Sequence, residues 1–316
     1  MRILILGAGG VGGYFGGRLV ESGADVTFLV RPERAKRLKE NGLVIRSPVG
    51  DAELQVKTIA AGDYDSKFDI VLIACKAYDL ESAGDALDAH IDAGAVALPI
   101  LNGMAHVDRL RDRFGHGRVV GGICQCSTTV NAFGEIEHLN PMARLVFGSF
   151  ADQPNRLETD PLLDDFLGVT TKAKFTSRRA DPIDQSLWDK WVMLATLAGM
   201  TTLMRASVGE IVSTKGGAEL MAEFLEESLA VATGSEYPPA PDYLASVRQL
   251  LFDPKSSFTA SMLRDMEAGG RIEGDQIIGD MYRRAHEMGL DAQLLRIAHC
   301  NLQAYEARRA KTEAEG

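Results

Sequence analysis

Cysteine, basic charge and long apolar runs are all scarce in this sequence. Only four of the 316 residues are cysteine, and none stands in a CxxC or zinc-like spacing, which excludes a disulfide framework and a zinc site. No run of about 18 apolar residues is present to span a bilayer. With 34 Lys and Arg against 44 Asp and Glu, the net charge is −10. A general affinity for nucleic acid or an anionic membrane is therefore not expected, and an anionic ligand needs a local positive site.

The cysteines and the N-terminus both indicate a cytoplasmic protein. Cys75, Cys124 and Cys126 lie in apolar, strand-like segments, where buried reduced thiols are expected. Arg2 followed by apolar residues imitates a signal peptide, but the apolar part, residues 3–6, is too short for the central region of one. We therefore expect free thiols and a cytoplasmic location.

The length predicts two domains, because one domain usually takes about 100–200 residues. Up to about residue 176, short β-branched runs alternate with amphipathic stretches, which is typical of a parallel sheet with helices on both faces. Strands are expected at 3–6, 26–30, 70–75, 96–101 and 119–124, with helices at 11–22, 33–41, 80–89 and 105–114. Residues 134–139 and 144–150 resemble a terminal antiparallel pair joined through Asn140 and Pro141.

Beyond Asp181 the strand signals stop and long helical patterns follow. Helices are expected at 182–198, 217–232, 241–250, 258–268, 272–288 and 292–310. Asp181 and Pro182 fit a helix N-cap followed by proline at the first helical position. The predicted architecture is an α/β domain over residues 1–178 and an all-helical substrate domain over residues 179–316, with the ligand site in the cleft between them.

The segment from Gly7 to Gly12 fits the pattern G-x-G-x-x-G, directly after a strand and at the start of a helix. The first glycine permits a tight turn, the second lets the backbone approach a pyrophosphate, and the third lets helix and strand pack closely. Backbone N–H groups and the helix dipole then bind the phosphates. The pattern alone is weak, but the βαβ context predicts a Rossmann dinucleotide-binding domain with these cofactor-binding residues: Gly7, Gly9, Gly10, Val11 and Gly12.

The end of the second strand indicates which dinucleotide is bound. An NAD enzyme places an acidic residue there to accept from the ribose 2′-OH, whereas this strand ends in Arg31. A guanidinium suits a 2′-phosphate through charge-assisted hydrogen bonds, so NADP(H) is the expected cofactor. The alternative is that Arg31, Arg34 and Lys36 only line a solvated helix start.

Two polar residues follow later strands. Lys76 comes directly after residues 70–75, and Asn102 after residues 96–101. Both should therefore lie at the carboxyl ends of parallel strands, where ligands bind in open α/β sheets. Each alone could be an ordinary loop residue, but together they favour a nicotinamide site.

Lys190 stands between Trp188 and Trp191 in a predicted helix. A lysine in so apolar a segment is either desolvated, which suits its ammonium group to general acid chemistry, or it extends to solvent along the helix surface. Glu273 and Ser261 lie on later predicted helices and are ordinary helix residues when considered alone.

Taken together, these segments resemble the ketopantoate reductase (2-dehydropantoate 2-reductase) family. The matching segments occur in the family's order and are Gly7–Gly12, Arg31-Pro32, Cys75-Lys76-Ala77, Leu101-Asn102-Gly103-Met104, Leu187-Trp188-Asp189-Lys190 and Ser261-Met262-Leu263-Arg264-Asp265 through Glu273. Each match is modest, and the combination is specific.

The resemblance implies NADPH-dependent reduction of the 2-oxo group of ketopantoate to pantoate, in pantothenate and coenzyme A biosynthesis. It implies that Lys190 is the general acid and that Glu273 pairs with and orients this lysine. Ser261 would hold the substrate, Asn102 would bind near the substrate and nicotinamide, and Lys76 would lie near the cofactor, which Glu273 also contacts. A cationic donor stabilises the charge that grows on the ketone oxygen, so no metal is required. The helical domain is expected to be similar to that of 6-phosphogluconate dehydrogenase.

One departure from the family concerns the substrate. Leu194 and Ala198 stand where the family commonly carries asparagines, four and eight positions after the lysine. Either another side chain such as Thr201 or Thr202 substitutes, or the substrate is less polar on that side.

Three functions therefore stay open. The first is a 2-dehydropantoate 2-reductase, and the second is a paralogue that reduces another branched 2-oxo acid or an imine. The third is a non-catalytic NADP(H) sensor, against which the retention of Lys190 with Glu273 argues. The apolar helix positions Met193, Leu197, Leu220 and Leu229 could belong to a core or to a homodimer interface.

Overall fold

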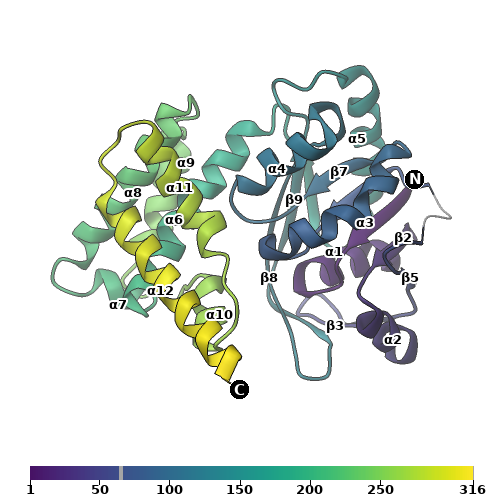
Figure 1. The fold of residues 1–316 in the computed structure, drawn as a ribbon, viewed down its shortest axis with the longest axis horizontal. Helices are drawn as coiled ribbons and strands as arrows, with labels where there is room; N and C mark the ends of the chain where they lie inside the picture. The colour runs from purple at the N-terminus through teal and green to yellow at the C-terminus, as the bar shows by residue number, and fades with distance from the viewer. Residues whose placement is uncertain (64–66, 316) are drawn as a thin grey trace. The chain divides into compact units, whose positions relative to one another are not determined.

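The computed structural model describes residues 1–63 and 67–315, and the chain divides into two compact units. The first unit comprises Met1–Leu101 and His106–Asp184, and the second comprises Asn102–Ala105 and Gln185–Gly316. In Figure 1 the first unit runs from purple to teal, and the second, apart from Asn102–Ala105, continues from green to yellow. The short segment Asn102–Ala105 thus belongs to the second unit, although most of its neighbours in sequence belong to the first.

A five-stranded parallel sheet forms the centre of the first unit. Its strand order is β5-β2-β1-β6-β7, and every pairing between neighbours is parallel. The strands are β1 (Arg2–Leu6), β2 (Asp25–Leu29), β5 (Lys57–Ile59), β6 (Ile70–Ile73) and β7 (Val96–Pro99). Four of them confirm strands expected from the sequence, whereas the short β5 was not expected.

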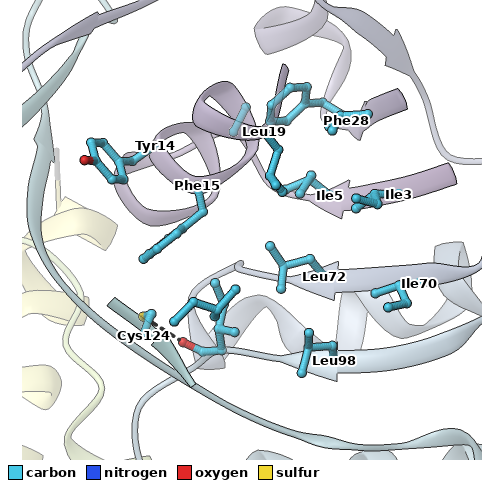
Figure 2. Close-up of a cluster of buried hydrophobic side chains, with 14 of the residues drawn as sticks. Ile3, Ile5, Tyr14, Phe15, Leu19, Phe28, Ile70, Leu72, Leu98 and Cys124 are labelled. Carbon is cyan, nitrogen blue, oxygen red and sulfur yellow. Dashed lines mark hydrogen bonds between the residues drawn. The ribbon is translucent and has the colours of Figure 1, made fainter. Parts of the chain in front are cut away.

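Side chains that alternate along the strands fill a core on each face of this sheet. Ile3 and Ile5 of β1 are fully buried on one face, where Figure 2 shows them in one buried cluster with Phe15 of the helix α1. Leu4 and Leu6 of β1 are buried on the other face. Successive side chains of a strand point to opposite faces of the sheet, so a strand with apolar residues at every position is covered on both sides. The helices expected around the sheet are confirmed as α1 (Gly10–Glu21), α2 (Pro32–Asn41), α3 (Leu80–Asp92) and α4 (Ala105–Phe114).

A second sheet completes the first unit, and it corrects two expectations. Its order is β10-β9-β3-β4, with β8 also paired to β9; the strands are β3 (Leu43–Arg46), β4 (Ala52–Leu54), β8 (Gly121–Val130), β9 (Ile136–Gly148) and β10 (Thr176–Arg179). The strand expected at 119–124 is not a member of the parallel sheet, because it begins β8, which pairs antiparallel with β9. An isolated parallel bridge, Ala97 with Val119, links the start of this segment to β7 of the parallel sheet.

The antiparallel pair expected around Asn140 and Pro141 is wrong, because both of its segments belong to the single strand β9. The pairing of β8 with β9 shifts register between Cys126 and Thr128, which oppose Ala143 and His138. The bulge accommodates Pro141, which has no N–H to donate to a regular ladder. The turn chemistry therefore produced an irregularity within a strand rather than a chain reversal.

The second unit is helical, as expected. Its helices are α6 (Asp184–Met204), α7 (Val208–Val212), α8 (Gly217–Gly234), α9 (Pro241–Leu251), α10 (Ser261–Glu267), α11 (Asp280–Glu287) and α12 (Gln293–Glu315). The helix expected at 272–288 is confirmed over 274–287, and its first part is a π-helical turn, η3 (Asp275–Gly279), that continues directly into α11. In the first unit, α5 (Arg156–Thr170), which contains Pro161, was not expected.

The predicted N-cap at Asp181 is wrong, because α6 begins at Asp184. The Asp181 carboxylate instead accepts a hydrogen bond from the backbone N–H of Ser149 at 2.7 Å and forms an ion pair with Arg179 at 2.6 Å. Tertiary partners therefore use the side chain that was expected to cap the helix. None of the helices in the described part of the chain is long and apolar enough to cross a membrane.

Candidate active site

The turn between β1 and α1 needs glycine at two positions for different reasons. Gly7 has a φ of 95°, in the left-handed region that side chains disfavour, and its N–H donates to the Leu29 carbonyl at 3.0 Å. A Cβ on Gly12 would lie 2.2 Å from the Gly7 carbonyl oxygen. Both residues therefore permit the helix to begin directly against the strand that precedes it.

The same turn leaves room at its outer side. Gly9 is exposed, and a Cβ added to it would meet no atom within 4 Å. Gly9 is also the N-cap of α1, and it has no side chain to accept hydrogen bonds from the first turn of the helix. The N–H groups of that turn, which begins at Gly10 and Val11, give this end of the helix a positive potential. This turn has the features that fit the pyrophosphate of a dinucleotide.

Gly7, Arg31 and Lys76 come after β1, β2 and β6, which are parallel neighbours in the first sheet. Their positions therefore share the carboxyl edge of that sheet. The chain winds outward in opposite directions from β1, through β2 on one side and β6 on the other, which makes this edge a topological switch point. Ligands of open α/β sheets bind in the crevice at such a point.

Arg31 forms an ion pair that the sequence did not indicate. Its side chain is 77% exposed, and Nη2 lies 3.1 Å from Oδ1 of Asp79 in the 3-10 turn η1 (Ala77–Asp79), which follows Lys76. Because β1 lies between β2, which precedes Arg31, and β6, which precedes Asp79, the pair bridges the end of β1. An exposed pair of this kind is worth about 0–1 kcal/mol, so Arg31 can exchange Asp79 for another anion at low cost.

Arg34 has a different environment. It is only partly exposed, and its guanidinium donates to the carbonyl oxygens of Ala8 and Gly134. Burial lowers the pKa of this arginine below its usual value. The interpretation of Arg34 as part of a solvated helix start is therefore wrong, and its contact with Ala8 links it to the glycine turn.

In the second unit the structure brings Lys190 and Asn102 together. Nζ of Lys190, on α6, donates a hydrogen bond to Oδ1 of Asn102 at 3.0 Å. Both residues are partly buried, while Trp188 and Trp191 on either side of the lysine are almost completely buried. The lysine is thus neither fully desolvated nor fully extended into solvent, and the amide oxygen fixes the position of its ammonium group.

The π-helical turn η3 supports this pair. Gly103 has a φ of 79°, and a Cβ there would lie 2.5 Å from the carbonyl oxygen of Gln276. The indole N–H of Trp191 donates to the Ile277 carbonyl at 3.0 Å. The residues next to Asn102 and Lys190 are therefore both held against the same turn. A π-helical turn is frequent at functional sites and has no signature in apolar periodicity, which explains why sequence reasoning missed it.

Glu273 and Ser261 occupy unlike positions in the second unit. Glu273 is 7% exposed and lies just before η3, whereas Ser261 is exposed and begins α10. A carboxylate buried to this degree needs polar or charged partners.

The helix face that follows Lys190 is apolar. Ala198 is completely buried and Leu194 is partly buried. The buried hydroxyl groups of Thr201 and Thr202 donate within α6, to the carbonyls of Leu197 at 2.7 Å and Ala198 at 2.6 Å. Their protons are therefore used inside the helix, and these threonines do not replace the donors of two asparagines.

A doubly wound parallel sheet with a glycine turn at its switch point, followed by a helical unit, defines the Rossmann class of two-domain proteins. Within that class, a family model described as "Ketopantoate reductase PanE/ApbA" matches residues 3–152. A second model, "Ketopantoate reductase PanE/ApbA C terminal", matches residues 182–306. Because the two models together match most of the chain, the protein belongs to the ketopantoate reductase family of oxidoreductases.

Individual relatives agree with the family over nearly the whole length. An uncharacterized oxidoreductase of Bacillus subtilis, YkpB, is 36% identical over 308 residues, which cover 97% of this chain and 99% of the relative. A 2-dehydropantoate 2-reductase of Pyrococcus abyssi is 27% identical over 301 residues, covering 93% of this chain and 94% of the relative.

Two solved structures have the same fold. The 2-dehydropantoate 2-reductase of Geobacter metallireducens has a TM-score of 0.86 at 24% identity and covers 96% of this chain and 99% of its own. A D-mandelate dehydrogenase, solved in a ternary complex with NADH and anilino(oxo)acetate, has a TM-score of 0.86 at 20% identity and covers 98% of this chain and 100% of its own. At these identities the likeness shows the fold alone.

Proposed function

We propose that the protein is an NADP(H)-dependent reductase of a 2-oxo acid, with ketopantoate (2-dehydropantoate) as its substrate, acting in the cytoplasm in pantothenate and coenzyme A biosynthesis. Residues 1–178 bind the cofactor and residues 179–316 supply the catalytic lysine. The observation that carries the proposal is the hydrogen bond from Lys190 to Asn102, which holds an ammonium group in place on a partly buried helix face.

In this proposal the chain supplies the proton and the charge, and the bound nicotinamide supplies the hydride. Lys190 donates a proton from Nζ to the oxygen of the ketone as negative charge develops there, and Asn102 keeps Nζ in position. Glu273 orients the lysine and Ser261 binds the substrate, as in the family. Gly7–Gly12 bind the pyrophosphate, Lys76 lies near the cofactor, and Arg31 binds the 2′-phosphate after leaving Asp79.

A second candidate is the reduction of a 2-oxo acid with a more apolar substituent. One observation favours it, the lack of hydrogen-bond donors on one part of α6. Leu194 and Ala198 are apolar, and the hydroxyl groups of Thr201 and Thr202 donate to carbonyls of the helix itself. A site without donors loses little binding free energy when it binds an apolar group, but it forms no hydrogen bond with the hydroxyl group of ketopantoate. The solved D-mandelate dehydrogenase shows that an enzyme of this fold acts on an aryl 2-hydroxy acid.

The experiment is the oxidation of NADPH and of NADH with a panel of 2-oxo acids that includes ketopantoate, 2-oxoisovalerate and phenylglyoxylate. The highest kcat/KM with ketopantoate and NADPH supports the first candidate, and a higher value with an apolar oxo acid supports the second. Tight cofactor binding without turnover of any acid would overturn both and leave the sensor function.

A further inference from the structure

The Ala8–Gly9 peptide, at the centre of the glycine turn, is held by a side chain from another element. Nη2 and Nε of Arg34 donate to the Ala8 carbonyl at 3.0 and 3.2 Å, so two N–H groups of the guanidinium bind one oxygen. Hydrogen bonds from a charged donor are roughly twice as strong as neutral ones. Ala8 itself is 5% exposed, so the contact is made to the carbonyl of a buried residue.

The other end of the guanidinium is fixed to a rigid turn. Nη1 of Arg34 donates to the Gly134 carbonyl at 3.0 Å, in the turn between β8 and β9. Asn131 stiffens that turn, because its Oδ1 accepts from the N–H groups of Phe133 and Glu135, both at 3.0 Å. Arg34 therefore bridges the glycine turn of the first sheet to a braced turn of the second.

The hairpin of β8 and β9 also lies against the start of α1. A Cβ on Gly10 would come within 3.0 Å of Oγ1 of Thr128, and one on Gly13 within 2.7 Å of Cδ1 of Ile136. The anchor of Arg34 thus lies on the same hairpin that packs against the helix end. The glycine turn is consequently held from two directions, by packing against its helix and by the guanidinium on its carbonyl.

The direction of the Ala8 carbonyl determines the direction of the next N–H. A peptide unit is planar, and the unit that joins Ala8 to Gly9 is trans, so its C=O and N–H point in opposite directions. With the oxygen turned toward Arg34, the Gly9 N–H points away from the guanidinium, and Gly9 is the exposed residue of the turn with open space around it. The same contact keeps a carbonyl oxygen, which would repel a phosphate, directed away from the open side.

We propose that Arg34 is a positioning residue for the dinucleotide: by holding the Ala8 carbonyl it orients the Gly9 N–H toward the pyrophosphate. The inference rests on the proposed cofactor site. It assigns different roles to two arginines of one segment. Arg34 affects binding of the pyrophosphate, which NADH and NADPH share, whereas Arg31 binds the 2′-phosphate, which only NADPH carries. Arg34 touches neither phosphate in this scheme and acts through the backbone.

The test measures dissociation constants of four ligands by calorimetry: NADPH, NADH, ADP-ribose and adenosine 2′-phosphate. Arg34→Ala is expected to weaken the three ligands that contain a pyrophosphate roughly tenfold or more and to leave adenosine 2′-phosphate unchanged. Arg31→Ala is expected to weaken NADPH and adenosine 2′-phosphate only. Arg37→Ala, which removes an exposed arginine from the same helix, is the control for charge and should leave all four unchanged.

Arg34→Lys and Arg34→Gln keep the test valid if the alanine variant does not fold. Each retains one donor group in place of the paired donors, so both should give intermediate losses for the pyrophosphate ligands. Equal loss of all four ligands would show a merely structural role, and full affinity of Arg34→Lys would show that charge alone matters; either result overturns the inference. If the wild-type protein binds none of the four, the proposed cofactor site fails and the inference with it, whereas binding that is unchanged in every Arg34 variant overturns the inference alone.

Discussion

The ammonium group of Lys190 and the side-chain oxygen of Asn102 are 3.0 Å apart, although 88 positions separate the two residues in the sequence. Asn102 follows the last strand of the parallel sheet, yet the segment Asn102–Ala105 packs with the helical unit. The hydrogen bond therefore joins a residue from a strand exit to a residue of α6. This pair leads to the first prediction.

Lys190→Ala should lower kcat by about 10²–10⁴-fold, because it removes the proton donor, and should leave the NADPH dissociation constant nearly unchanged. Asn102→Ala should lower kcat less, since the lysine remains and only a hydrogen bond to a charged group, worth about 1.5–3 kcal/mol, is lost. Steady-state kinetics and calorimetry measure both effects. Lys215→Ala, which changes an exposed lysine of the same unit, is the matched control. Turnover by Lys190→Ala at the wild-type rate would remove the assigned role.

The ion pair between Arg31 and Asp79 leads to a prediction about cofactor choice. Asp79→Asn removes a negative charge beside the proposed 2′-phosphate site and releases the guanidinium from its partner. We expect NADPH to bind a few-fold more tightly and NADH to bind as before, because an exposed pair contributes only about 0–1 kcal/mol. Titration of both cofactors gives the ratio directly. A weaker affinity for both cofactors would contradict this reading, since it would mean that Asp79 itself contacts the dinucleotide.

The hydrogen bond from Trp191 to the Ile277 carbonyl should stabilise the second unit. Trp191→Phe keeps the aromatic ring but leaves a buried carbonyl without this donor, so the free energy of unfolding should fall by about 1–3 kcal/mol. Urea unfolding measures the change. Trp188→Phe is a suitable comparison, because Trp188 is buried in the same aromatic cluster, stacked on Tyr237. An equal loss in both variants would show that ring packing, not the hydrogen bond, is responsible.

His138 should make the first unit sensitive to mild acid. Burial lowers the pKa of His138 below its ordinary value, against the effect of its hydrogen bond with the Met142 carbonyl, and the charge of Arg18 lowers it further. The lowered pKa means that the folded protein favours the neutral imidazole. In that form Nε2, 3.1 Å from the Met142 carbonyl, donates to it, and Nδ1 accepts from the Ser47 hydroxyl at 2.9 Å.

The sign of the pH effect follows from this shift. The unfolded chain, with a histidine pKa of about 6.5, takes up the proton first as the pH falls. The contribution of neutral His138 to the free energy of unfolding is thus fully present above the pKa of the unfolded chain and is lost as the pH falls below that value. The free energy of unfolding should decrease between about pH 7.5 and 5.5, and His138→Gln should flatten the slope. An unchanged slope in His138→Gln would contradict the prediction.

Sequence reasoning located the elements whose signals are local. The apolar runs of β1, β2, β6 and β7 could be recognised because each strand is buried on both faces. The glycine turn could be recognised because Gly7 needs a positive φ and Gly12 has no room for a Cβ. Such requirements restrict the residue type at a single position, so they are visible in the chain itself.

Other elements depended on partners distant in sequence. Asn140 and Pro141 have the chemistry of a chain reversal, yet pairing with β8 makes them a bulge within β9. Asp181 has the chemistry of an N-cap, yet Ser149 and Arg179 use its carboxylate. In each case a tertiary interaction outweighed a local preference worth only about 1 kcal/mol.

The sequence by itself therefore determined the fold class, the glycine turn that we assign to the cofactor and the identity of the lysine and asparagine that we assign to catalysis. Tertiary structure alone decided that Lys190 binds Asn102, that a π-helical turn supports both residues, and that Arg34 faces the Ala8 carbonyl while Arg31 faces Asp79. The physical reason is that backbone conformation and burial select residue types locally. The direction of a side chain among several polar partners is set only when the folded chain brings those partners within hydrogen-bond distance.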